Sequence, residues 1–107
     1  DVVTGEALTA ALLAEGPPPE AIHYLNDAMA IGGLRALLAA GVEVPGRTSV
    51  IGFNGTSLRH AIQTRLTTLV VPLHEIGARA AQALLQPGGA RMDLVDFQIV
   101  PGTTVRT

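Results

Sequence analysis

A strand–helix–strand pattern between residues 21 and 54 constrains the fold of this chain more than any other feature. An apolar run at 21–25 is followed by helical spacing of apolar side chains over 29–38, and a second apolar run occupies 49–53. Gly41 stands where the helix is expected to end. Because a connection of this length joins parallel strands, the pattern predicts an α/β fold with a parallel sheet and flanking helices.

The helices have recognisable start signals. Thr4 is a candidate N-cap for a helix over residues 6–15, and Asp27 is the expected N-cap of the central helix. Gly32 and Gly33 lie inside that central helix, where glycine is unfavourable. Their presence predicts a close approach of the helix backbone to the sheet.

The second half of the chain is expected to contribute two strands and one helix. A β-rich segment at residues 66–71 ends at Pro72, and helical periodicity returns over 73–85. Residues 92–100 alternate in a way that is typical of a further strand.

Composition restricts the function classes. The chain has 107 residues, 48% of them apolar and 15% charged, which suits one small folded domain or a piece of a larger one. The net charge is −2 and there is no lysine, so no basic patch for nucleic acid is expected; a DNA-binding function would need residues outside this chain. There is no cysteine and no apolar run long enough to cross a bilayer. The chain lacks an initiator Met and a signal-peptide pattern, and we expect it to be excised from a longer protein.

No arrangement of residues predicts catalysis or a bound metal. His23, His60 and His74 do not have the spacing of a metal site. The sequence also contains no nucleophile–base pair, no paired carboxylates within one motif and no glycine-rich phosphate loop. We therefore predict neither an enzyme nor a cofactor.

Two asparagines are the first candidates for ligand binding. Asn26 and Asn54 each follow a predicted strand, and open parallel sheets bind ligands at the edge formed by the carboxyl ends of their strands. The alternative is that each amide bonds only to the local backbone. Asp27 and Tyr24 are further candidates, whose alternatives are helix capping and core packing. His23 and Tyr24 point in opposite directions along their strand, so only one of them can face the ligand.

Three motifs in one order resemble a known family. Residues 25–32 read LNDAMAIG, residues 44–53 read VPGRTSVIGF, and residues 66–68 read LTT, followed by Pro72 and by Ile-Gly at 76–77. Together they resemble LacI/GalR-type transcriptional repressors. Such proteins combine a helix-turn-helix DNA-binding domain with a two-lobed effector domain that is similar to type I periplasmic sugar-binding proteins.

The resemblance implies that this chain is an incomplete fragment, the C-terminal part of the effector domain. By analogy, residues 1–70 and 100–107 belong to the second lobe, and residues 71–99 return to the first. The helix at 73–85 would then lack most of its sheet, so the chain is not expected to form one self-contained globule.

The resemblance also implies a function. A sugar or sugar acid would bind between the lobes, contacted by Asn26, Asp27, Tyr24 and Asn54, and would shift the equilibrium between closure states. The family usually carries an Asp at the position of Asn54, where it bonds the effector; Asn lacks that charge, which suits a ligand with a carboxylate or phosphate. We expect a cytoplasmic homodimer that has no contact with a membrane and reaches DNA only through a domain absent from this chain.

The dimer face is also implied by the family. Its matching positions are Ile31, Leu34, Ala61 and Ile62, although these side chains could instead face the core of the lobe.

A solute-binding receptor of a sugar transport system is the alternative. Residues 52–56, GFNGT, resemble the GFDGT often carried by such receptors, whereas the motifs at 44–53 and 66–68 favour the regulator. Residues upstream of Asp1 would discriminate, since a helix-turn-helix supports one function and a signal peptide supports the other.

Overall fold

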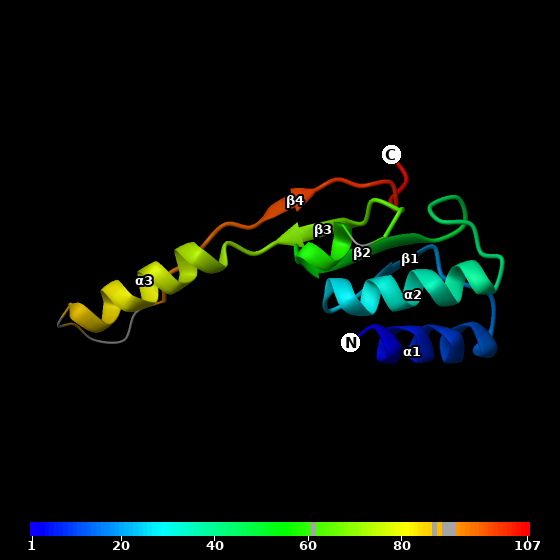
Figure 1. The fold of residues 1–107 in the computed structure, drawn as a ribbon, viewed down its shortest axis with the longest axis horizontal. Helices are drawn as coiled ribbons and strands as arrows, with labels where there is room; N and C mark the ends of the chain where they lie inside the picture. Colours follow the sequence, from blue (N-terminus) through cyan, green and yellow to red (C-terminus); the bar gives the residue numbers. More distant parts are fainter. Residues whose placement is uncertain (61, 87, 89–91) are drawn as a thin grey trace.

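The computed structural model describes residues 1–60, 62–86, 88 and 92–107. Figure 1 shows helices and strands alternating along most of the chain, as expected for an α/β protein. The elements are α1 (Val2–Glu15), β1 (Ala21–His23), α2 (Asp27–Ala39), β2 (Ser49–Asn54), the 3-10 helix η1 (Ser57–His60), β3 (Thr67–Val70), α3 (Leu73–Leu85) and β4 (Gln98–Val100).

The sheet has the order β1-β2-β3-β4. Strands β1, β2 and β3 run parallel, which confirms the predicted parallel sheet, whereas β4 pairs antiparallel with β3. The strand expected over residues 92–100 is present only at 98–100, so that prediction was too long. The reason is the length of its neighbour: β3 contains only four residues, and the chain then leaves the sheet for α3.

The two N-terminal helices begin differently from the prediction. Helix α1 starts at Val2 and is capped by Asp1, whose Oδ1 accepts a hydrogen bond from the Thr4 amide at 2.8 Å. Thr4 is therefore inside the first turn and is not the cap. Helix α2 is capped by Asn26, so the assignment of Asp27 as its N-cap was also wrong.

Both helices cover one face of the sheet, and α2 lies between the sheet and α1 in the view of Figure 1. The core beneath α2 consists of five buried side chains: Tyr24, Ala30, Leu37, Val50 and Leu66. Gly5 and Gly32 allow the backbones of α1 and α2 to touch. The predicted close approach therefore exists, but Gly32 meets α1 rather than the sheet, and Gly33 meets the Tyr24 ring just beyond β1.

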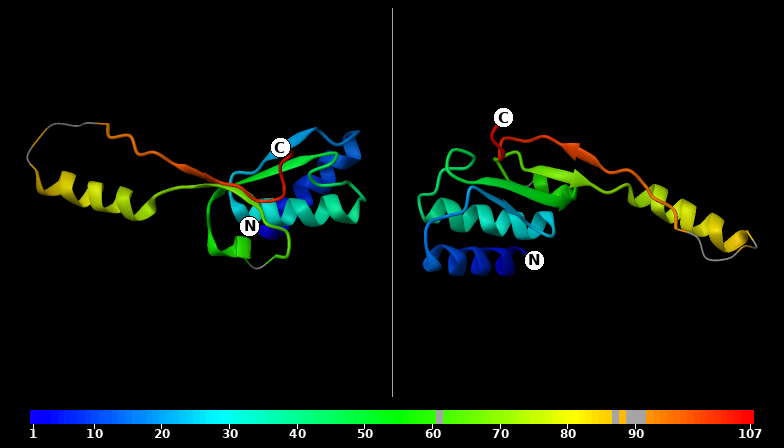
Figure 2. Two further views of the ribbon diagram at one scale, coloured as in Figure 1. Left: turned by 90° about the horizontal axis from the view of Figure 1, so that it is seen from above. Right: turned by 180° about the vertical axis from the view of Figure 1, so that it is seen from behind.

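The molecule is elongated, with extents of 56 × 25 × 23 Å. Its radius of gyration is 17.0 Å, whereas a compact chain of this length would have a value of about 13 Å. Helix α3 protrudes from the sheet in every view of Figures 1 and 2 and contains no buried residue. Within the described ranges, no helix is long and apolar enough to span a membrane.

The C-terminal tail returns to the sheet (Figure 2). Thr104 is fully buried and lies where β2 and β3 begin. Its hydroxyl donates to the Val50 carbonyl at 2.7 Å and accepts from the Thr67 amide at 2.9 Å. One side chain thus connects two parallel strands at the edge opposite their carboxyl ends.

A methyl group at position 32 should separate the two helices. In Gly32→Ala the new Cβ would lie closer than 3.0 Å to the Val2 carbonyl oxygen. We expect a loss of about 2 kcal/mol in the free energy of unfolding of the full-length protein, measured by chemical denaturation, because a crowded backbone contact forces the helices apart. Gly16→Ala is the control, since nothing lies within 4 Å of a Cβ at that position. Equal stability of the two variants would contradict the close helix contact.

Candidate functional site

The carboxyl ends of β1, β2 and β3 meet at one edge of the sheet. The register pairs His23 with Ile51 and Asn54 with Val70, so β2 ends beside the end of β3 and just past the end of β1. Asn26 follows β1 and Asn54 is the last residue of β2. We call these two side chains, at this edge, the amide pair.

Asn26 is half-buried, and its side-chain oxygen accepts a hydrogen bond from the helix that follows it. Its Oδ1 accepts the Met29 amide hydrogen at 2.9 Å, which is the N-cap bond of α2. The local backbone bond considered as its alternative role is therefore present. An amide side chain also carries an NH2 group, and this donor makes no hydrogen bond to a residue that the structure describes.

Asp27 connects three segments of the chain. Its side chain is fully buried. The Oδ2 atom accepts hydrogen bonds from the Thr56 amide at 2.5 Å and from the Thr56 hydroxyl at 3.1 Å. The Oδ1 atom accepts a hydrogen bond from the Thr68 hydroxyl at 2.5 Å. Gly52 makes room for this carboxylate, because a Cβ there would collide with Oδ1. Both oxygens thus have partners within the chain, which ties α2 to the turn after β2 and to β3.

Asn54 has an unusual backbone conformation. Its φ is 92°, and the next residue, Gly55, has a φ of 68°. Asn tolerates positive φ better than most residues, so the backbone favours Asn or Gly at this position. The side chain is half-buried and makes no hydrogen bond to any residue that the structure describes.

Tyr24 directly follows β1, but its side chain packs into the core. It is 6% exposed, and its hydroxyl is 2.7 Å from Thr9 Oγ1. The Thr9 hydroxyl donates its one hydrogen to the Gly5 carbonyl, so Tyr24 is the donor between the two hydroxyls. Burial raises the pKa of Tyr24 above its usual value. The structure gives this ring a packing role, and the predicted ligand contact stays a prediction.

His23 faces the opposite way. Its side chain is exposed, and its ring meets Phe53 edge-on with 6.3 Å between the ring centres. The alternation expected along β1 is therefore present. Because Tyr24 packs into the core beneath the helices and His23 is exposed, alternation puts His23 on the opposite face of the sheet.

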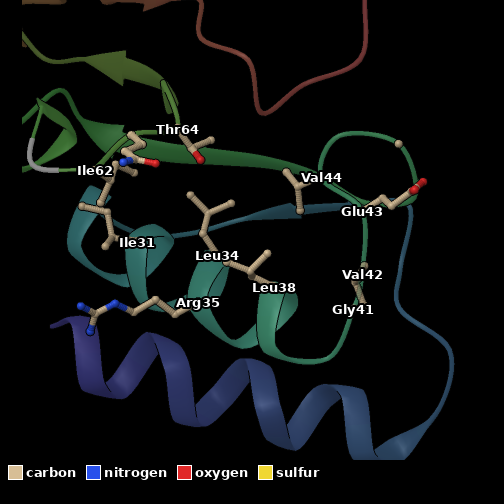
Figure 3. Close-up of a pocket in the computed structure, with 12 residues that line it drawn as sticks. Ile31, Leu34, Arg35, Leu38, Gly41, Val42, Glu43, Val44, Ile62 and Thr64 are labelled. Atoms are coloured by element: carbon tan, nitrogen blue, oxygen red, sulfur yellow. The ribbon is translucent and has the colours of Figure 1, made fainter.

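A separate apolar groove of about 800 Å³ runs beside α2 (Figure 3). It brings together Ile31, Leu34 and Ile62, three of the four residues predicted for a dimer face; Ala61 is outside the described residues. Further apolar side chains of the groove are those of Leu38, Val42 and Val44. Leu38 is 79% exposed and was not among the residues predicted for the dimer face, although it continues the same helix face, four residues beyond Leu34 and three beyond Arg35.

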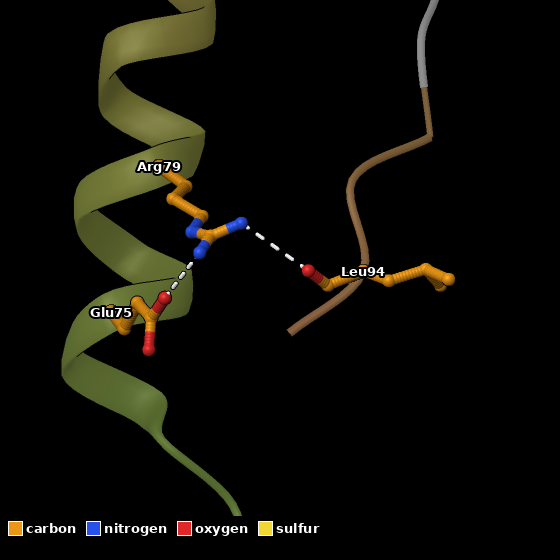
Figure 4. Close-up of polar contacts among 3 residues, drawn as sticks. All are labelled: Glu75, Arg79 and Leu94. Carbon is orange, nitrogen blue, oxygen red and sulfur yellow. Dashed lines mark hydrogen bonds and ion pairs between the residues drawn. The ribbon is translucent and has the colours of Figure 1, made fainter. Parts of the chain in front are cut away.

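Helix α3 is tied to the chain segment that returns from it. Arg79 bonds Glu75 one turn earlier, and its Nη1 donates to the Leu94 carbonyl at 3.2 Å (Figure 4). A hollow of about 310 Å³ beside this contact is lined partly by Ile76, Ala83 and Val95. These contacts keep the segment beside α3 without forming a ladder of strand hydrogen bonds.

Among the residues that the structure describes, no group of three or more His, Cys, Asp or Glu side chains could hold a metal ion. The strand-edge arrangement is instead one of neutral amides supported by a buried carboxylate.

Comparison with known proteins identifies the family of this chain. Residues 2–105 match the family described as a periplasmic binding protein-like domain. The chain belongs to this family. The resemblance to LacI/GalR-type repressors and the predicted fold, a parallel sheet with flanking helices, are confirmed.

The relatives are transcriptional regulators by name. The chain is 40% identical over 85 residues to a probable HTH-type transcriptional repressor, ExuR, of Bacillus subtilis strain 168, covering 79% of this chain and 26% of that protein. It is 41% identical over 71 residues to the HTH-type repressor MelR of the same strain, covering 66% of this chain and 21% of that protein. The chain thus spans about a quarter of the length of the curated relatives it matches.

Solved structures of LacI-type regulators have the same fold as this chain. A crystal structure of the lac repressor dimer bound to operator and the anti-inducer ONPF superposes with a TM-score of 0.90 and 28% identity, covering 98% of this chain and 38% of that one. A LacI family regulator from Arthrobacter sp. FB24 in complex with lactose superposes with a TM-score of 0.84 and 30% identity, covering 98% of this chain and 41% of the other.

Removal of the buried carboxylate should weaken the sheet edge. Asp27→Ala leaves the Thr56 amide and the Thr68 hydroxyl without their acceptor, and we expect a loss of about 3 kcal/mol or more in the free energy of unfolding. Asp27→Asn should lose less, because one oxygen remains and the Thr68 hydroxyl can turn to accept a hydrogen bond.

Chemical denaturation of the full-length protein measures both losses. The control is Glu20→Ala, which removes an exposed carboxylate and should change stability little. If Asp27→Ala were no less stable than this control, the carboxylate would not brace the three segments.

Proposed function

We propose that the chain is part of the effector-sensing domain of a LacI-type transcriptional regulator that binds a small sugar-like metabolite. The observation that carries this proposal is the amide pair at the carboxyl edge of a parallel sheet, in a chain of the periplasmic binding protein-like family. Ligands of open parallel sheets bind at this edge. Among the described residues, neither the Asn26 NH2 group nor the Asn54 side chain has a hydrogen-bond partner.

The proposal includes two lobes. Residues 1–70 and 100–107 form one of them, and residues 71–99 belong to the other. Two features support this division: α3 buries none of its residues, and the tail returns to bond β2 and β3 through Thr104. Effector bound between the lobes would favour one closure state by its differential affinity for the two.

A regulator is favoured over a transport receptor and over an enzyme. The relatives ExuR and MelR are repressors by name, and the similar lac repressor structure is bound to operator DNA. In the proposed protein, DNA contact would come from a domain absent from this chain, in the cytoplasm where the operator lies. Sensing requires binding and a shift in population without covalent chemistry.

A homodimer is the second part of the proposal. The groove beside α2 presents Leu38, which is 79% exposed, next to Ile62, which also packs against the core. The lac repressor structure that this chain resembles is a dimer. In an isologous contact the groove of one protomer would face the same groove of its partner.

The amide of Asn54 should be needed for effector binding. We choose Asn54→Gly because glycine accepts the positive φ, so the variant removes the side chain without straining the backbone. A thermal-shift screen of the full-length protein with sugars, sugar acids and sugar phosphates should find a ligand that raises the melting temperature. The variant should lose about tenfold or more in affinity for that ligand, or about 1.4 kcal/mol. Unchanged affinity would remove Asn54 from the site, and stabilisation by purines or amino acids alone would contradict a sugar-like effector.

A charge in the groove should weaken the dimer. Leu38→Arg places a cation in an apolar contact, and we expect the dimer dissociation constant to rise by about tenfold or more, measured by sedimentation equilibrium. Val3→Arg is the matched control, because Val3 is also helical, apolar and 74% exposed, but lies on α1. A dimer weakened equally by both variants, or by neither, would contradict the assignment of this groove.

A further inference from the structure

The chain contains two asparagines, and the structure holds their side chains differently. Asn26 is followed by Asp27, and its Oδ1 accepts the Met29 amide hydrogen at 2.9 Å. Asn54 is followed by Gly55, and its half-buried side chain makes no hydrogen bond to a described residue. One carboxamide is therefore held at the start of a helix, whereas the other has no such restraint within the described chain.

The backbone favours an Asn-Gly pair at residues 54–55. Asn54 has a φ of 92°, in a region that Gly, Asn and Asp adopt more readily than other residues. Gly55 lies just beyond β2 with a φ of 68°, and a Cβ on it would lie 2.5 Å from Cγ2 of Val70. Because the fold needs a residue without Cβ directly after Asn54, no side chain on residue 55 shields its amide nitrogen from the Asn54 carboxamide.

We propose that Asn54 is a site of spontaneous deamidation. The amide nitrogen of Gly55, after loss of its proton to base, attacks Cγ of Asn54, and the new N–Cγ bond closes a succinimide ring. The Cγ–Nδ2 bond breaks, and the leaving nitrogen takes up a proton and departs as ammonia. Water then opens the ring on one of two sides. Cleavage of the N–Cγ bond gives aspartate in a normal main chain, and cleavage of the bond to the main-chain carbonyl carbon gives isoaspartate.

The two products affect the sheet edge differently. Aspartate leaves the length of the main chain unchanged and adds a negative charge. Isoaspartate also places Cβ and Cγ of residue 54 in the main chain, so the path from β2 to Thr56 becomes longer by one atom. The Thr56 amide and hydroxyl both donate to Oδ2 of the buried Asp27, at 2.5 Å and 3.1 Å. Isoaspartate therefore displaces Thr56 and removes donors from a buried carboxylate.

Aging of the full-length protein in mildly alkaline buffer tests the proposal, with Asn26 as the internal control. Peptide mapping by mass spectrometry follows the replacement of an amino group by a hydroxyl group at each asparagine. We expect Asn54 of the folded protein to deamidate about tenfold or more faster than Asn26. A parallel sample unfolded in urea gives the rate without the fold. Equal rates at the two asparagines of the folded protein, or modification of Asn54 only after unfolding, would overturn the proposal.

Two variants at the same position identify the products. Asn54→Gly accepts the positive φ and has no carboxamide, so the acidic species that anion exchange resolves from aged protein should not form. Persistence of the same species in this variant would place the modification at another residue and contradict the proposal. Asn54→Asp carries the charge of both products in a main chain of normal length, and is therefore the matched control for isoaspartate.

Thermal unfolding measures the effect on the contact between Thr56 and Asp27. We expect the isoaspartate form, purified from aged protein, to melt about 2 °C or more below the Asn54→Asp variant, because only isoaspartate displaces Thr56. Fragmentation of the peptide by electron transfer distinguishes isoaspartate from aspartate. Equal melting temperatures of the isoaspartate form and the Asn54→Asp variant would overturn the predicted effect on Asp27.

Discussion

The buried carboxylate of Asp27 is the interaction on which the carboxyl edge of the sheet depends. It stands at the first position of α2 and reaches the turn after β2 and the hydroxyl on β3. A buried charge is stable only when hydrogen bonds replace the water it has lost, and Thr56 and Thr68 supply them. Because these contacts join residues 29 and 41 positions apart in the chain, one side chain holds the start of α2 to the turn after β2 and to β3.

Local patterns in the sequence were sufficient for most of the elements. The boundaries of α3 agree with its apolar periodicity, and β2 ends at the predicted Asn54. The extent of β4 could not be read in the same way, because alternation describes a residue's surroundings and not whether a neighbouring strand exists. The same limit explains Gly32: a glycine within a helix signals a close contact, but whether the neighbour is a helix or the sheet depends on packing.

The position of the candidate site could be predicted from the sequence, whereas the hydrogen bonds around it could not. Parallel strands with polar residues at their carboxyl ends located Asn26 and Asn54, since this follows from topology alone. The sequence did not show that Asn26, and not Asp27, caps α2, because both residue types cap helices well. The partners of Asp27 were missed for another reason: a threonine carries no local signal that it will bond a carboxylate far away in the chain. Tyr24 was ambiguous because alternation along a strand separates two faces without saying which one the helices cover.

The pairing of β3 with β4 has a mechanical consequence. The chain leaves the sheet through β3 and comes back through β4, and the two are joined side by side by an antiparallel ladder from Thr68–Val100 to Val70–Gln98. Pro72 follows the outgoing strand and Pro101 the incoming one, and each restricts rotation about its own backbone. Helix α3 is thus joined to the sheet at two neighbouring points, where β3 ends at Val70 and β4 begins at Gln98. Any movement of α3 relative to the sheet must therefore be accommodated by both connections at once.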